Sequence, residues 1–323
     1  MASLTLFLLR RLLFALILVA AVSSAALLLT RLAPGDVTTS LGPFAPAAEV
    51  ARERARFDLD RSIVEQWAVW AWRAVRFDFG DSFLYNRPVA TLIRDAALNT
   101  ALLAVVALAL ATLAGIPLGI LTGSRRSGIV PMLVRGVSIL CLSMPPLLTS
   151  LLLMFVAASA GWFPTGGMTS ANAVDMGWGE WVADVAWHLP LPALALALPI
   201  AATFERLQAQ AIGEVIQQPF ILAAVARGVP RPRLLVRHAW RASLRSICAV
   251  YGLAIASLLS GSFVVEYIAA WPGLGRLMYE ALRARDIYLV AGCAAAGAMF
   301  LAIGSFVADL MLAKADPRVA EAR

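Results

Sequence analysis

Residues 210–245 read QAIGEVIQQPFILAAVARGVPRPRLLVRHAWRASLR, a polar stretch with an apolar block on each side of it. Its apolar positions recur at the spacing of one helix face, which predicts a short amphipathic helix. These positions are Ile216, Phe220, Ala223 and the stem of Arg227. Gly228 can adopt a positive φ and end that helix, and Pro230 and Pro232 prevent its simple continuation. With a second helix from about Arg233, the stretch is predicted to form a helix, a tight turn and a helix, a shape suited to docking into a groove on a partner protein.

The composition excludes an ordinary soluble domain. Hydrophobic residues make up 61% of the chain, charged residues 15%, and the mean hydropathy is +0.80. The apolar residues form blocks long enough to cross a bilayer, which takes about 20 residues each. A net charge of +7 and a pI near 10.0 could indicate nucleic-acid binding. In a chain this apolar, cytoplasmic arginines that orient the spans explain the charge better.

Six apolar blocks are predicted to be transmembrane helices. The first follows Arg10 and Arg11, and the small residues 23–26 leave a cleaved signal peptide as a rival interpretation. The block is long for a signal peptide and more apolar blocks follow it, so we predict a transmembrane helix. The predicted spans are residues 1–32, 98–121, 132–158, 189–204, 247–268 and 290–312.

The arginines predict the orientation of these spans. The stretch 205–245 holds seven arginines against two glutamates, which places it in the cytoplasm. The loop that ends at His188 holds acidic residues without Lys or Arg, as expected of an external loop. Six spans then put both termini in the cytoplasm. The external insertion 33–96 is also rich in arginine, but segments longer than about 60 residues largely escape the rule.

The insertion is predicted to hold two short helices. Pro46 opens the first, which runs to about Phe57. The second covers 61–76 and places five apolar residues on one face. These are Ile63, Trp67, Trp70, Ala71 and Ala74. That face either lies in the membrane interface, where indoles prefer to sit, or packs against the outer ends of the spans.

Three features inside the spans allow both a structural and a functional interpretation. The pair Pro145-Pro146 after Ser143 breaks the third span, either as a packing kink or as a kink that lines a translocation path. A small-residue cluster in the fifth span allows close helix approach or lines a pore. It consists of Ser257, Ser260, Gly261 and Ser262. Glu266, near the outer end of this span, either holds an external loop or faces the path.

Two elements of the opening stretch carry a family resemblance. Ala224-x-Ala226-Arg227-Gly228, followed by Leu234-Leu235 and Arg237-His238-Ala239, resembles the EAA loop of ABC-importer permeases. It is most similar to the dipeptide/oligopeptide/nickel permease family. This chain differs from the family's pattern by Phe220 for Tyr, Val225 for Arg, Arg227 for Lys and Ser243 for Asn. Further motifs along nearly the whole chain resemble that family's B-type subunits, at residues 31–36, 77–82, 161–167, 266–275, 286–288 and 315–318.

The resemblance implies an all-α polytopic membrane protein of the type I ABC-importer permease fold, with six transmembrane helices. It divides the chain into a first helix (1–32), an external insertion (33–96), a five-helix core (97–318) with a cytoplasmic coupling loop (205–245), and a tail (319–323). The implied location is the bacterial inner membrane, with several passes. The implied function is that of a permease subunit of an ATP-driven importer for peptides or a related small solute.

The resemblance also implies residues and partners. ATPase-coupling residues would be Phe220, Ala223, Ala224, Ala226, Arg227, Gly228, Val229 and Arg233. The translocation path would include Ser143, Pro145, Pro146, Ser257, Ser260, Gly261 and Glu266. An external gate or turn would be formed by Trp271, Pro272, Gly273 and Gly275. The implied partners are a second, C-type permease subunit, two ATP-binding subunits that carry ATP and Mg, an extracytoplasmic solute-binding protein and membrane lipid, without nucleic acid.

We find no catalytic constellation in the sequence. His188 and His238 lie on opposite predicted sides of the membrane, and no Walker-type phosphate loop is present. The three cysteines lie in apolar blocks without metal-ligand spacing, so we expect inert thiols and no bound metal or cofactor. The alternative function is a membrane scaffold or channel whose basic cytoplasmic loop binds another partner. The substrate within the family's range, and the choice between a heterodimer and a homodimer, stay open at this point.

Overall fold

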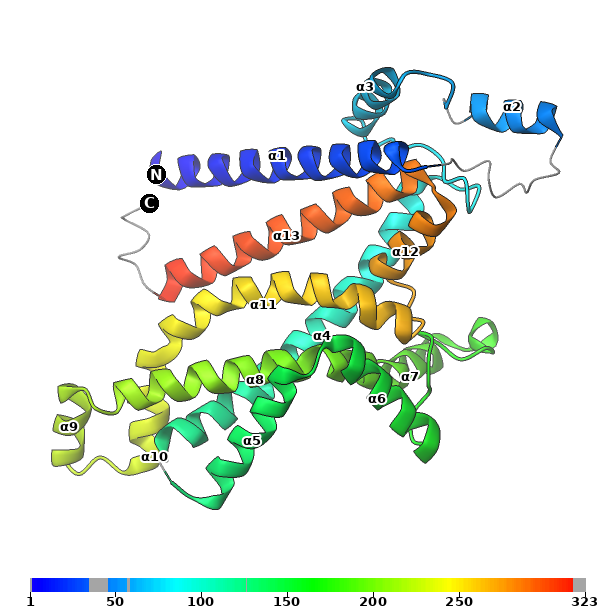
Figure 1. The fold of residues 1–323 in the computed structure, drawn as a ribbon. Coiled ribbons are helices and arrows are strands. Elements are labelled where there is room, and N and C mark those ends of the chain that lie inside the picture. The colour runs from blue at the N-terminus through cyan, green and yellow to red at the C-terminus, as the bar shows by residue number, and fades with distance from the viewer. Residues whose placement is uncertain (1, 35–45, 57–58, 126, 316–323) are drawn as a thin grey trace. The chain divides into compact units, whose positions relative to one another are not determined.

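The computed structural model of the chain describes residues 2–34, 46–56, 59–125 and 127–315. Within these ranges the regular secondary structure is helical, apart from one isolated bridge between Asp81 and Pro88. The predicted all-α fold is therefore confirmed (Figure 1). Parts of the family motifs at residues 31–36 and 315–318, and the whole predicted tail 319–323, lie outside the described residues.

Five helices in the described part of the chain hold stretches long and apolar enough to cross a membrane. They are α1 (Ala2–Leu32), α4 (Val89–Ser124), α8 (Pro190–Val215), α11 (Trp240–Ile268) and α13 (Ile287–Ala315). Each coincides with a predicted span. Only the end of the fourth span was predicted wrongly, since α8 continues past Phe204 to Val215, with Pro199 inside the helix. The extension looks polar in sequence, but Glu205 and Gln208 are only 3% and 0% exposed.

The third span is broken, not kinked. α5 (Ile129–Ser143) and α6 (Pro146–Ala160) meet at an angle of 110°, and the pair covers the range of the predicted third span, 132–158. Met144 and Pro145 are both extended, with ψ of 121° and 145°. A proline disfavours the helical conformation of the residue before it, so two consecutive prolines end α5 and allow α6 to begin only at Pro146.

The chain forms two compact units, which we describe separately. The first unit comprises Met1–Ala101 and Pro272–Ala302, and the second comprises Leu102–Trp271 and Ile303–Arg323. In the first unit, α2 (Ala47–Arg56) and α3 (Ile63–Ala74) are the two helices predicted for the insertion.

The amphipathic face of α3 packs against the protein. Trp70 is 4% exposed and belongs to the same buried cluster as Leu27 of α1, with Trp67 packed against it. On the other side of the helix Trp72 is 63% exposed, and the Arg76 guanidinium lies 4.6 Å from the centre of its ring. Of the two interpretations of this face, burial favours packing.

A helix that the sequence did not predict follows the turn at Pro272 and Gly273, which was predicted to be external. α12 (Leu274–Ala284) begins directly after Gly273, and its first amide donates to Thr100 Oγ1 at 2.7 Å. Behind it, Asp286 is 1% exposed and accepts hydrogen bonds from Ser82 Oγ at 2.7 Å and from the amides of Leu84 and Leu289 at 3.1 Å. One buried carboxylate therefore fixes the loop at Ser82 and Leu84 and caps the start of α13.

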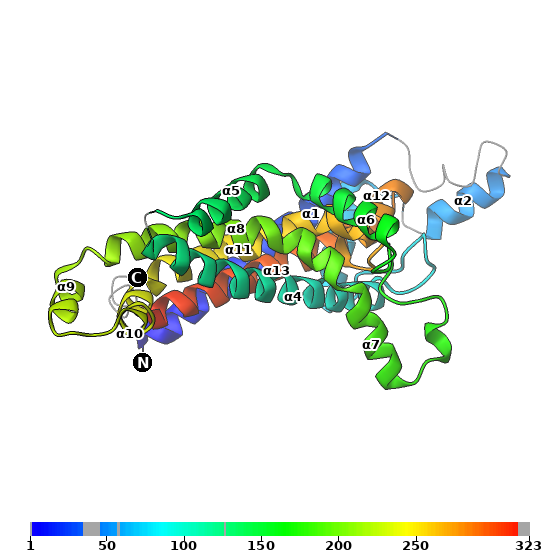
Figure 2. The same ribbon diagram turned by 90° about the horizontal axis from the view of Figure 1, so that it is seen from below.

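α8 is the central helix of the second unit, and α5, α6 and α11 all pack against it. Figure 2 shows α8 and α11 side by side. Buried side chains from three helices meet along it, and they include Ala107, Leu196, Phe204 and Leu258. This packing gives a rigid base to the segment between α8 and α11.

α4 and α8 approach so closely that only glycine fits between them. A Cβ atom at Gly115 would lie 2.5 Å from Ala201 O, and one at Gly119 would lie 2.6 Å from Glu205 O and 2.6 Å from Gln208 Cβ. Gly123 meets the backbone of Ala209 in the same way. The glycines follow each other every four residues and form the GxxxG pattern of close helix packing in membranes. We call these three residues the α4 glycine groove.

Candidate functional site

The short helix predicted near Phe220 is α9 (Pro219–Ala226), and its ends follow from its sequence. Pro219 occupies the first helical position, where a missing N–H is tolerated. At the other end Gly228 has a φ of +74°, as predicted, and its amide donates to Val225 O at 2.9 Å. The Val229 amide donates to Ala224 O at 3.2 Å, which completes a Schellman motif.

The predicted second helix is also present, and it runs without a break into the fifth span. α10 (Arg231–Arg233) begins after Pro230 and passes into a π-helix, Leu234–Ala239, which continues as α11. π-Helical turns are rare and occur frequently at functional sites. A displacement of the turn at Gly228 would therefore act directly on a membrane-spanning helix.

The inward face of α9 differs from the predicted one. Ile221 and Ala224 are both 1% exposed and pack with Ile212 of α8 and with Leu234 and Ala239 of the π-helix. The prediction joined Ile216 to the same face as Phe220 and Ala223. The chain turns between Ile216 and Pro219, so that the periodicity does not continue across it, and Phe220 and Ala223 are exposed.

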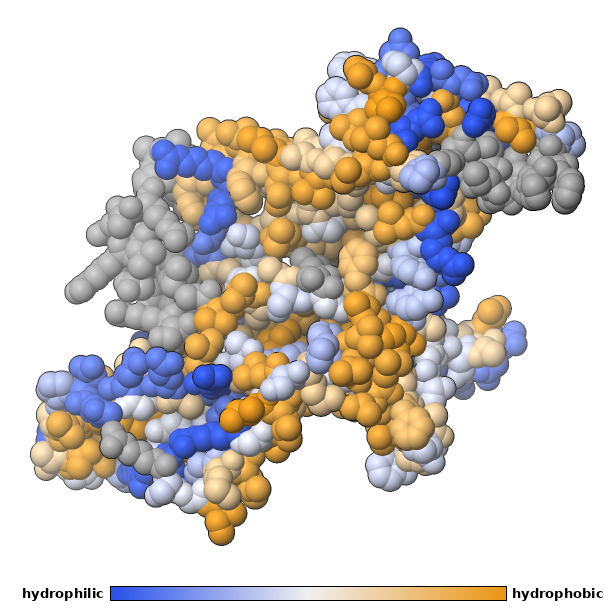
Figure 3. All heavy atoms as spheres, viewed as in Figure 1, coloured by the Kyte–Doolittle hydropathy of each residue, from blue (hydrophilic) through white to orange (hydrophobic). Residues whose placement is uncertain are grey.

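Three large apolar side chains of α9 are exposed instead. Phe220, Leu222 and Val225 are 48%, 59% and 55% exposed. Phe220 lies on one side of the buried residues Ile221 and Ala224, and Leu222 and Val225 lie on the other side. We call the three exposed residues together the α9 outer face. In Figure 3 apolar residues stand among hydrophilic ones at this end of the unit. Clustered exposed apolar side chains commonly mark interaction sites.

The eight predicted coupling residues divide between the two sides. Those on the exposed side are Phe220, Ala223, Ala226, Arg227, Gly228 and Arg233. Ala224 is buried and Val229 is partly buried against the same cluster. The two inward residues hold the helix in place, whereas the others are free to meet another molecule.

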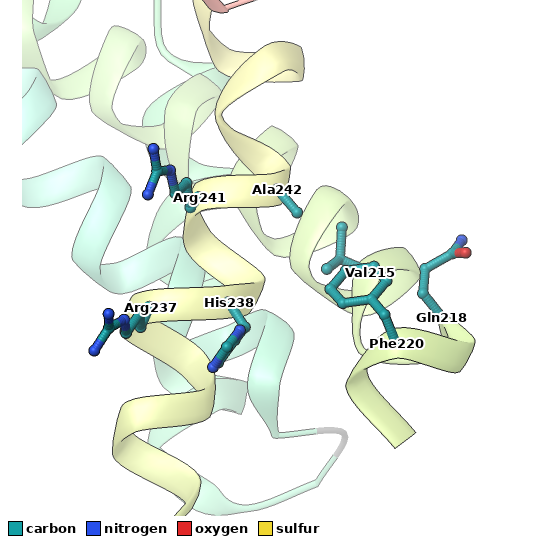
Figure 4. Close-up of a pocket in the computed structure, with 7 residues that line it drawn as sticks. All are labelled: Val215, Gln218, Phe220, Arg237, His238, Arg241 and Ala242. Carbon is teal, nitrogen blue, oxygen red and sulfur yellow. The ribbon is translucent and has the colours of Figure 1, made fainter. Parts of the chain in front are cut away.

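A pocket of about 820 Å³ lies beside α9. It is lined by Val215, Gln218, Phe220, Arg237, His238, Arg241 and Ala242. In Figure 4 Phe220 and Val215 lie across from His238 and Ala242, and the two arginines extend from the other side of their helix. The pocket therefore places the aromatic ring of Phe220 opposite the imidazole of His238, while the two guanidinium groups point away from the ring.

Two arginines bind carbonyl groups at the end of α4, Arg231 from the turn after α9 and Arg135 from α5. Arg231 Nη2 donates to Ser124 O at 2.8 Å, and Arg135 Nη2 donates to Thr122 O at 2.9 Å. The last carbonyl groups of a helix lack partners within it and carry a partial negative charge, so arginine is well placed there. The turn after α9 is thereby held against α4.

Buried polar bonds continue this attachment between the helices, and the sequence did not predict them. Thr122 Oγ1 donates to the Glu205 carboxylate, and Gln208 Nε2 donates to Ser243 Oγ at 2.7 Å. All four residues are at most 3% exposed. They connect α4 to α8 and α8 to α11 beside the α4 glycine groove. The four-residue spacing of the groove's glycines is the feature of the sequence that could have predicted this close packing.

Some of the predicted path residues come together. A Cβ atom at Gly261 would lie 3.4 Å from Leu196 and 3.9 Å from Pro146, so α11, α8 and α6 approach one another there. The hydroxyls of Ser143 and Ser257 donate to carbonyls of their own helices, Ile139 O and Ala254 O. Pro145 is exposed, and Glu266 is fully buried. The side chain of Ser260 lies outside the described residues, and a role of these residues in a path stays a prediction.

The four residues of the predicted external gate belong to two different compact units. Trp271 is fully buried in the second unit, where its amide donates to Glu266 O at 2.8 Å. Pro272, Gly273 and Gly275 belong to the first unit and open α12. Among the described residues, no group of three or more His, Cys, Asp or Glu side chains could hold a metal ion.

The fold and the site define a polytopic membrane protein that presents a short helix and turn between two spans. Residues 115–321 match the model of the family described as binding-protein-dependent transport system inner membrane component, and the chain belongs to this family. It is accordingly a multi-pass inner-membrane permease component with the type I importer fold.

Relatives match almost the whole chain. It is 30% identical to the oligopeptide transport system permease protein AppB of Bacillus subtilis over 316 aligned residues. The aligned region covers 97% of this chain and 98% of the relative. It is 35% identical over 295 residues to a putative peptide transport system permease protein of Brucella suis, covering 90% and 91%. It is 32% identical over 324 residues to the oligopeptide transport system permease protein OppB of Mycobacterium bovis, covering 98% and 99%.

Proposed function

We propose that this chain is the B-type permease subunit of an ATP-driven importer that takes up peptides or a related small solute. The α9 outer face carries the proposal, because it offers an apolar docking surface on a helix that is fixed to three spans. The names of the relatives support peptides as the substrate class. An extracytoplasmic binding protein would deliver the solute to a cavity between this chain and a second, C-type permease subunit.

Two ATP-binding subunits, which carry ATP and Mg, would supply the energy. Both termini and α9 would lie in the cytoplasm, as the arginine distribution indicates. ATP-driven closure of the two subunits would pull on α9. The continuous helix from Arg231 to Ile268 and the bonds at Ser124 and Ser243 would then transmit the movement to the spans as a rigid body.

Affinity purification of the chain from its native membrane, followed by mass spectrometry, tests this function. We expect two ATPases, a second six-span permease and a binding lipoprotein in the eluate. Recovery of the chain alone, or with nucleic acid or an unrelated membrane complex, would contradict the proposal.

The variant Phe220→Ala is expected to lose the ATPases in the same experiment. Phe220 is about half exposed, so its removal leaves the inward packing of α9 intact. Truncating an aromatic anchor at an interface costs about 2 kcal/mol, or roughly 30-fold in affinity. Phe155→Ala is the matched control, since Phe155 of α6 is 72% exposed. If the Phe220 variant retains the ATPases as tightly as wild type, Phe220 is not the anchor.

A further inference from the structure

α7 (Trp178–His188) lies between two membrane-spanning elements. α6 ends at Ala160 and α8 begins at Pro190, so the segment between them connects two membrane-spanning elements on one side of the membrane. This segment holds no Lys or Arg. Trp162, directly after α6, is 70% exposed and extends the exposed apolar surface of that helix.

One face of α7 is apolar and unpartnered over its first half. Trp178, Trp181 and Val182 lie at positions i, i+3 and i+4, and they are 82%, 38% and 41% exposed. We call these three residues the α7 outer face. Val185, one turn further along the same face, is 6% exposed and belongs to the core of the second unit. The end of α7 is therefore anchored to the protein, and its beginning extends away from it.

The polar side of α7 is engaged within the protein. Asp184 accepts hydrogen bonds from the Ser170 amide at 2.6 Å and from Ser170 Oγ at 2.7 Å, and these bonds lower the pKa of its carboxyl group. Glu180 accepts a bond from the Gly177 amide at 3.2 Å. Both acidic residues lie on the helix side away from Trp178, where Trp187 is 54% exposed and its ring centroid lies 4.8 Å from that of Phe163.

We propose that the α7 outer face lies in the headgroup region of the outer leaflet and anchors the segment 161–189 to phospholipid. Indoles favour this region, and an amphipathic helix with an aromatic face binds in the plane of a membrane. α6 also exposes apolar side chains, since Leu151, Phe155 and Val156 are 48%, 72% and 52% exposed. This inference concerns the external side of the chain and does not rest on the transport function.

The occupant is expected to be lipid without a requirement for anionic headgroups. In-plane helices that depend on anionic lipids carry Lys and Arg on their polar face, and α7 carries Glu180 and Asp184 instead. Attachment should therefore come from the burial of the indoles and should be complete in zwitterionic phospholipid.

Spin labels at two neighbouring positions test the proposal. In a full-length chain whose native cysteines are replaced by serine, Trp181→Cys places a label on the outer face, and Glu180→Cys places one on the polar side. Both variants are reconstituted in nanodiscs of phosphatidylcholine, and their accessibility to oxygen and to a water-soluble nickel chelate is compared. We expect the label at 181 to favour oxygen several-fold over the nickel chelate relative to the label at 180.

Equal access of the nickel chelate to both labels would overturn the proposal. A label at 181 that becomes shielded only when the partner subunits or the binding protein are added would show a protein occupant and would also overturn it. Quenching by lipids brominated near the headgroup provides a second measurement on a chain with native cysteines. The quenched fraction of tryptophan fluorescence should fall in Trp178→Phe/Trp181→Phe, and an unchanged or larger fraction would contradict lipid contact.

Discussion

Replacing Gly119 of α4 by alanine is expected to lower the melting temperature of the protein sharply and to remove most of its transport activity. The added Cβ would lie 2.6 Å from Glu205 O, a distance that only a backbone shift can relieve. Overpacking of a tight core costs about 1–3 kcal/mol. Here the backbone shift would also break the buried hydrogen bond that Thr122 donates to the Glu205 carboxylate.

Gly136→Ala is the control for this substitution. Gly136 also lies within a helix, α5, but no atom of the described residues lies within 4 Å of a Cβ built there. Alanine favours the helical conformation over glycine by about 1 kcal/mol, so this variant should be neutral or slightly more stable. The melting temperatures are measured on detergent-purified protein. Equal melting of the two variants would show that α4 and α8 do not pack as closely as described.

The substitution Gly228→Pro is expected to abolish ATP-coupled transport while leaving membrane insertion intact. Proline fixes φ near −65°, whereas Gly228 has a φ of +74° and donates its amide to Val225 O. The Schellman motif that ends α9 therefore cannot form, and the α9 outer face loses its fixed orientation. Because the position is exposed and no described atom crowds it, the packing of the spans is unaffected.

Gly228→Ala should give an intermediate result. There is room for its Cβ, but a left-handed conformation costs a residue with a side chain about 1–2 kcal/mol. Insertion is measured as the yield of folded protein in the membrane fraction, and coupling as ATP hydrolysis stimulated by the binding protein in the reconstituted complex. Wild-type stimulation in Gly228→Pro would contradict a coupling role for this turn.

Patterns that depend on local chemistry were predictable from the sequence. The positive φ of Gly228 follows from a glycine placed before Pro230, and the presence of α9 follows from the apolar run after Pro219. The spans follow from hydropathy alone. The two prolines at 145 and 146 likewise predicted an interruption, but its angle of 110° depends on how α6 packs against α8 and α11.

Features that depend on packing between distant segments were predicted poorly. Glu205 and Gln208 looked like loop residues because their partners, Thr122 and Ser243, are far away in sequence. α12 was not predicted, although Leu274, Leu277, Met278 and Ala281 recur at helical spacing and lie in or against the buried cluster of the first unit. The glycines at 115, 119 and 123 were visible in the sequence as well, and their four-residue spacing was not recognised.

The π-helix Leu234–Ala239 determines which side of the fifth span, α11, faces α9. Leu234 and Ala239 are both buried against α9, at 6% and 0% exposed, although they are five residues apart. On an α-helix two side chains five residues apart point about 140° apart. In a π-helix the hydrogen bonds join residues five apart, and the wider turn brings these two side chains onto the same side of the helix. Deleting one residue here, such as Val236, which is 59% exposed, would restore α-helical winding and turn one of the two away from α9. The single additional residue in this turn therefore keeps both Leu234 and Ala239 in contact with α9 while the chain continues into the membrane helix α11.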